Sequence, residues 1–98
     1  MFRKLSVKRY IKKLRPVLEK QYGQRSSYSA SQIRETVFKK DFNTKYLPLA
    51  YIMCLRKDEL ATVLGVEFPN LCITNFELNV RNLVDSPEIS QHFNTLRH

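Results

Sequence analysis

The sequence is poor in the residues that build irregular segments and covalent or metal-bound cross-links. Among its 98 residues are two glycines, four prolines, two cysteines and no tryptophan. Two glycines cannot supply a glycine-rich phosphate-binding loop, and so little glycine and proline leaves little room for long linkers. The longest apolar run, residues 47–55, has nine residues and includes a proline, whereas a membrane span needs about 20. We therefore expect a folded chain with no transmembrane segment.

The two cysteines do not indicate a metal site or a disulfide. Cys54 and Cys72 are 18 positions apart with no histidine close to either in the sequence, which is not the spacing of a zinc site. The N-terminus lacks the uninterrupted apolar stretch of a secretory signal, so we expect a cytoplasmic protein with reduced thiols. Both cysteines have apolar neighbours, which predicts buried and inert side chains. Nothing predicts a metal or a cofactor.

Catalytic residues are also scarce. The two histidines, His92 and His98, have no partner placed by local spacing. Asp85, Ser86 and Ser90 could accompany His92 in a triad, but helix capping explains Asp85 and Ser86 better. We therefore expect a protein that is not an enzyme.

The apolar residues recur with the period of helices throughout the chain. Apolar content of 43% and 27% charged residues are typical of a soluble globular domain, and 98 residues suit one domain. No segment alternates as a strand would, and no Asn-Gly or Asp-Gly hairpin turn occurs. The sequence predicts a single compact all-α domain, 1–98, of five or six short helices. We expect these helices over residues 2–18, 30–40, 44–55, 59–64, 70–84 and 87–96.

Several helix boundaries carry local signals. Ser29 followed by Gln32 predicts a capping box, with Tyr28 packing on Ile33 as a hydrophobic staple. Gly23 is expected to end the first helical region and Gly65 the fourth. The order Ser86, Pro87, Glu88 is typical of a helix N-terminus, with Ser86 as the cap.

The net charge of +8 is concentrated at the N-terminus. Seven basic residues lie within 1–15, no acid precedes Glu19, and the other 83 residues have a balance of +1. On a helical wheel, residues 1–15 form an amphipathic helix whose basic side could contact the phosphates of a nucleic acid without sequence specificity. Six phosphate contacts predict that log K falls with log salt at a slope of about −5. The candidate polyanion-binding residues are Lys4, Lys8, Arg9, Lys12, Lys13 and Arg15.

Other interpretations of the basic segment stay open. It could be the solvated side of a core helix, a helix that lies on a membrane surface, or a mitochondrial presequence. Pro16 should kink this helix or begin a second one.

Residues 59–76 resemble a helix-turn-helix motif. Ala61, Gly65 and Leu71 stand at its spacing, with alanine allowing close helix approach and glycine taking the positive φ of the turn. The second helix would present Glu67, Phe68 and other residues poorly suited to reading base edges. A packing turn between two helices is therefore the preferred interpretation.

Tyrosine is enriched at protein interfaces, although it also serves at core edges. Tyr22, Tyr28, Tyr46 and Tyr51 are the candidates for a protein interface. The alternative function is accordingly a protein–protein adaptor or homodimer with no nucleic-acid role.

The middle of the chain also resembles a known family. The residues Tyr22-Gly23, Tyr28, Gln32-Ile33, Asn43, Tyr46 and Ala50-Tyr51 are similar to those of a family of short, uncharacterised, all-helical bacterial proteins. The resemblance implies a stand-alone domain of bacterial cytoplasmic origin and assigns no site. We predict a small non-enzymatic binding module whose first candidate partner is nucleic acid.

Overall fold

The computed structural model describes residues 3–84 and 87–96, and it confirms the predicted all-α domain. This part of the chain contains no β-strand, only an isolated parallel bridge between Tyr28 and Leu55. Its six helical segments are α1 Arg3–Arg9, which runs through η1 Tyr10–Leu14 into α2 Arg15–Tyr22; α3 Ala30–Lys39; η2 Thr44–Tyr46, which leads into α4 Leu47–Cys54; α5 Lys57–Glu67; α6 Ile73–Leu83; and α7 Pro87–Leu96.

The basic helix packs its apolar side into the core. Val7, Tyr10, Leu14 and Leu18 are fully buried. Its central segment, η1, is a π-helix that ends shortly before Pro16, which lies at the start of α2. Proline lacks the N–H for the preceding turn, and its ring collides with the carbonyl four residues earlier. A wide turn at this point lets the helix continue past Pro16 without a break.

The third helix begins and ends as local chemistry dictates. Ser29 accepts from the Gln32 backbone N–H, and the Gln32 side chain accepts from the Ser29 N–H, which confirms the capping box. At the other end Phe42 N–H donates to Val37 O and Asp41 N–H to Phe38 O. These two bonds form a Schellman motif around Asp41, which has a φ of 59°. Gly23 has a φ of 91° and ends α2, as predicted.

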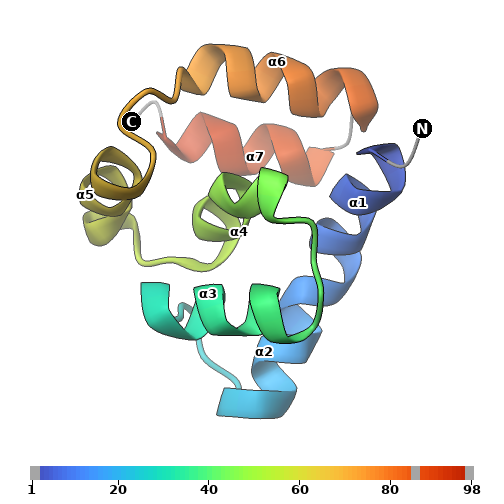
Figure 1. Ribbon diagram of the computed structural model, residues 1–98, viewed down its shortest axis with the longest axis vertical. Coiled ribbons are helices and arrows are strands. Elements are labelled where there is room, and N and C mark those ends of the chain that lie inside the picture. Colours follow the sequence, from blue (N-terminus) through green and yellow to red (C-terminus); the bar gives the residue numbers. More distant parts are fainter. Residues whose placement is uncertain (1–2, 85–86, 97–98) are drawn as a thin grey trace.

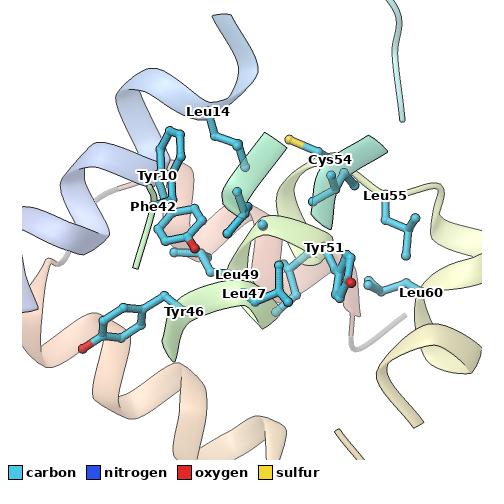
Figure 2. Close-up of a cluster of buried hydrophobic side chains, with 14 of the residues drawn as sticks. Tyr10, Leu14, Phe42, Tyr46, Leu47, Leu49, Tyr51, Cys54, Leu55 and Leu60 are labelled. Carbon is cyan, nitrogen blue, oxygen red and sulfur yellow. The ribbon is translucent and has the colours of Figure 1, made fainter. Parts of the chain in front are cut away.

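Helix α4 lies at the centre of the molecule, between α3 on one side and α6 and α7 on the other, with α1 and α5 at the flanks (Figure 1). Every residue of 47–55 except Met53 is buried, so this helix has no polar side. A helix that is apolar on all sides needs partners on all sides. Figure 2 shows side chains from several helices gathered around it.

The C-terminal helices close the remaining side of the core. The rings of Phe76 in α6 and Phe93 in α7 lie 6.1 Å apart between centroids. Glu77 is buried, and its carboxylate pairs with Arg81 one turn later at 2.7 Å. Ser86, the predicted cap of α7, lies outside the described residues, as do residues 1 and 2 of the predicted basic helix.

Candidate functional site

Four lysines of the N-terminal helix form a basic surface that points away from the core. We call Lys4, Lys8, Lys12 and Lys13 the lysine face. Lys8 is half-buried and the other three are exposed. None of the four makes an ion pair or hydrogen bond with another residue in the described part of the chain. Their charges are therefore available to an anionic partner.

Arg9 has a structural role that the sequence did not reveal. Its Nη1 donates to Asp41 O and its Nη2 to Lys40 O, both at 2.7 Å. The guanidinium carbon also lies 4.1 Å from the centre of the Phe42 ring. The cation thus closes the C-terminus of α3, where the helix dipole is negative. Its planar fork is well suited to two neighbouring carbonyls, which occupy both of its terminal nitrogens.

Arg15 also donates its side-chain hydrogen bonds to backbone carbonyls of the same domain. Its Nη1 donates to Arg25 O at 3.1 Å, and its Nη2 to Ser26 O and Met53 O at 3.3 Å. These bonds tie α2 to the following loop and to the end of α4. Of the six predicted polyanion-binding residues, only the four lysines have no partner among the described residues.

The fold also places further cations beside this helix. The bonds from Arg9 to the end of α3 bring exposed Lys39 and Lys40 alongside α1. Asn43 Nδ2 donates to Ser6 Oγ at 3.3 Å, which fixes the segment before exposed Lys45 on the same helix. Sequence reasoning missed these three lysines because they are far from α1 along the chain, and no local pattern links them to it.

Most of the predicted tyrosine interface is corrected. Tyr28, Tyr46 and Tyr51 are each 4% exposed or less, so they pack within the domain, and only Tyr22 is half-buried. Tyr28 donates its hydroxyl to Gly23 O at 2.8 Å. Burial removes the accessible surface that an interface requires.

Tyr51 belongs to a polar cluster that joins three helices. Its hydroxyl donates to Glu67 Oε1, and Arg34 Nη1 donates to Glu67 Oε2, each at 2.5 Å. Burial, reinforced by the bond to Glu67, raises the pKa of Tyr51 above its ordinary value. The first cause that raises the pKa of Arg34 is the hydrogen bond that its guanidinium donates to the Tyr51 hydroxyl oxygen. Because the three residues come from α3, α4 and α5, the cluster clamps these helices together.

The geometry of a helix-turn-helix is absent at the predicted position. Gly65 lies inside α5 without a positive φ, and the helix continues to Glu67. Ala61 and Gly65 are both exposed, so neither serves a close approach of two helices. The predicted helix end at Gly65 is wrong because glycine ends a helix only where the chain turns, and a single interior glycine is tolerated.

Ala61 and Gly65 instead border an open groove of about 1480 Å³. Its apolar lining comes from the end of α4, from α5 and from the segment that leads into α6, and includes Leu60, Leu64 and Phe68. His92 also lines the groove. Asp58 at its rim pairs with Arg56 at 3.1 Å. The groove can accept an apolar partner surface.

The thiols differ in their surroundings. Burial raises the pKa of Cys54 to about 11, so this thiol stays protonated and unreactive at neutral pH. Cys72 is exposed at the start of α6, which corrects its predicted burial. Among residues 3–84 and 87–96, no three histidine, cysteine or acidic side chains lie close enough to bind a metal ion.

Comparison with known proteins identifies the family of this chain. The profile of a family of unknown function, DUF6559, matches residues 1–95. The chain belongs to this family. No curated protein and no solved structure matches the chain.

The family match covers the lysine face, the groove and the polar cluster within one unit. It confirms the predicted membership of an uncharacterised family. It brings no assigned site, so the functional argument depends on the chemistry of the surface. No described helix is both long and apolar enough to cross a membrane.

Proposed function

We propose that this protein binds nucleic acid through the sugar–phosphate backbone, with the lysine face as the principal contact. The observation that carries the proposal is the run of cations without an acid before Glu19, four of which have no partner among the described residues. Lys39, Lys40 and Lys45 extend the positive surface from the neighbouring segment.

Lysine suits backbone binding without sequence specificity. Its ammonium is a compact, hydrated charge on a flexible stem, which follows phosphates but does not read bases in a fixed geometry. Arg9 and Arg15, the two arginines among the predicted phosphate contacts, donate instead to backbone carbonyls. The expected contact is therefore electrostatic and strongly dependent on salt.

The salt dependence follows from the number of lysines. Four phosphate contacts predict a slope of about −3.6 for duplex DNA and about −2.8 for a single strand. A fourfold rise in salt should then weaken duplex binding roughly 150-fold.

The test is fluorescence anisotropy with labelled duplex DNA and single-stranded RNA at several salt concentrations. We expect Lys8→Gln combined with Lys12→Gln to weaken binding and to reduce the magnitude of the slope by about 2. The matched control is Lys20→Gln combined with Lys57→Gln, which removes the same charge from exposed positions elsewhere. A slope near zero, or equal losses in the two double variants, would contradict the proposal.

A protein–protein adaptor is the second candidate, and the apolar groove is the observation that favours it. Its expected occupant is an amphipathic partner helix with acidic flanks. The lining is largely apolar, Lys57 at the rim has no ion pair with a described residue, and the chain carries a net charge of +8.

A labelled helical peptide with leucines on one side and glutamates on the other provides the probe for this groove. A Cβ atom built on Gly65 would meet nothing within 4 Å, so a side chain can start from this position, and Gly65→Leu should obstruct the groove and abolish peptide binding. A peptide with lysines in place of the glutamates is the control, and equal binding of both would refute the charge argument. A molecular mass that doubles with concentration, without peptide, would instead indicate a homodimer.

A further inference from the structure

A small hollow lies between η2 and α6. Its volume is about 330 Å³, at the lower end of the roughly 300–1,000 Å³ of small-ligand sites. Its lining combines two aromatic rings, two amides and one cation. The residues are Lys45, Tyr46, Phe76, Asn79, Asn82 and Leu83.

The hollow is held next to the N-terminal helix. Tyr10 donates its hydroxyl to Asn43 O at 2.6 Å, and Asn43 in turn donates to Ser6 Oγ. The Asn43 side chain also accepts from the Lys45 N–H at 3.0 Å, which caps η2. Helix α6 packs against α1 as well. The hollow and the N-terminal helix are therefore neighbours in the fold.

Tyr46 contributes an unpaired hydroxyl to the hollow. Only 4% of the residue is exposed, and Figure 2 shows its side chain pointing away from the neighbouring Leu47 and Tyr51. Its hydroxyl makes no hydrogen bond with any described residue, and it is not sealed from solvent. The position of Phe76 is set by its contact with Phe93 on one side. Tyr46 can therefore offer the hollow little more than its hydroxyl, whereas the half-buried Phe76 offers part of its ring.

The amides of Asn79 and Asn82 are equally free. They stand three residues apart on α6, so they lie on the same side of the helix as neighbours. Both are exposed, and neither hydrogen-bonds a residue in the described ranges. Asparagine lowers helix propensity, and at these interior positions it caps nothing.

These groups are complementary to an unpaired nucleobase. A base offers a flat π surface for the accessible part of the Phe76 ring, and an edge of donors and acceptors for the asparagine amides and the Tyr46 hydroxyl. Lys45 can contact the adjoining phosphate. A duplex hides the base edges and faces that such a hollow would bind, whereas a single strand presents them.

We propose that this hollow binds one unpaired base of a single-stranded nucleic acid whose phosphates follow the lysine face. The inference rests on the proposed function and names its substrate class. It predicts tighter binding of single strands than of duplexes of equal length, with Asn79, Asn82 and Tyr46 as the residues that discriminate.

The test compares Asn79→Ala combined with Asn82→Ala against Asn75→Ala, an exposed asparagine of α6 outside the hollow. Alanine favours helices, so these variants should fold. The probes are fluorescein-labelled single-stranded RNA, single-stranded DNA of the same sequence, and the corresponding duplex. We expect the double variant to lose at least fivefold in affinity for single strands, with an unchanged salt slope and unchanged duplex affinity. Tyr46→Phe should give a smaller loss of the same kind.

The outcomes separate the two proposals. If the wild type binds with a steep salt dependence that the lysine variants reduce, while Asn79→Ala with Asn82→Ala binds single strands normally, only the base site is refuted. Equal losses for single strands and duplexes would refute it as well. If the wild type binds no nucleic acid, both proposals fail.

Discussion

The replacement Arg9→Lys tests whether this residue stabilises the fold or contacts a ligand. Arginine makes two hydrogen bonds to the Lys40 and Asp41 carbonyls and lies over Phe42. Lysine keeps the positive charge, which the helix terminus and a nucleic acid would both attract. It loses the planar fork, so at most one carbonyl retains its donor, and the stacking on the ring is weaker.

The expected cost follows from these contacts. One net hydrogen bond contributes about 1 kcal/mol, and the loss of part of an exposed cation–π contact adds up to about 0.5 kcal/mol. Arg9→Lys should therefore lower the free energy of unfolding by about 1–1.5 kcal/mol, which corresponds to roughly 5–10 °C in Tm for a domain of this size. Urea unfolding followed by circular dichroism measures this change, and the m-value should stay constant.

Lys12→Gln is the matched control, because it should affect binding and leave stability unchanged. Lys12 is exposed without an ion pair among the described residues, so its replacement should change stability by no more than about 0.5 kcal/mol. It should weaken nucleic-acid binding, whereas Arg9→Lys should leave binding unchanged. Unaltered stability of Arg9→Lys, or a loss of affinity as large as that of Lys12→Gln, would refute the division between a structural arginine and a lysine face.

Three further predictions concern stability. Asp41→Gly should raise the free energy of unfolding by about 1 kcal/mol, because the left-handed conformation is strained for aspartate and free for glycine. A lower free energy of unfolding, measured by chemical denaturation, would contradict the Schellman geometry. Gly65→Ala should stabilise α5 by about 0.5–1 kcal/mol, because the new Cβ meets open space within a helix; destabilisation would instead support a turn at Gly65. Burial raises the pKa of Cys54 from 9.0 to about 11, so the unfolded thiol ionises first and stability should fall between pH 9 and pH 11. The Cys54→Ala variant should lack this fall in stability between pH 9 and pH 11. If the variant and the wild type lose stability equally over that range, the burial of Cys54 is contradicted.

The helix boundaries that were predicted correctly depend on interactions between residues close together in the sequence. The capping box at Ser29 and Gln32, and the stop at Gly23, depend on hydrogen bonds and φ values inside one turn. Helix periodicity likewise places Val7, Tyr10, Leu14 and Leu18 on one side of the first helix, and this side is fully buried. These features depend on the order of neighbouring residues and survive any arrangement of the helices in space.

The roles of the polar side chains were decided by the tertiary structure. Arg9 and Arg15 bond to carbonyls up to 38 residues away, so on a helical wheel they could not be distinguished from the lysines beside them. The same holds for Tyr46 and Tyr51, whose burial requires other helices to cover them. Short-range order and composition were enough to predict the order of the helices and the basic character of the first one. Which cations stay free, and which aromatic rings reach the surface, depended on packing between distant segments, since a side chain's partners are set by the folded arrangement of the whole domain.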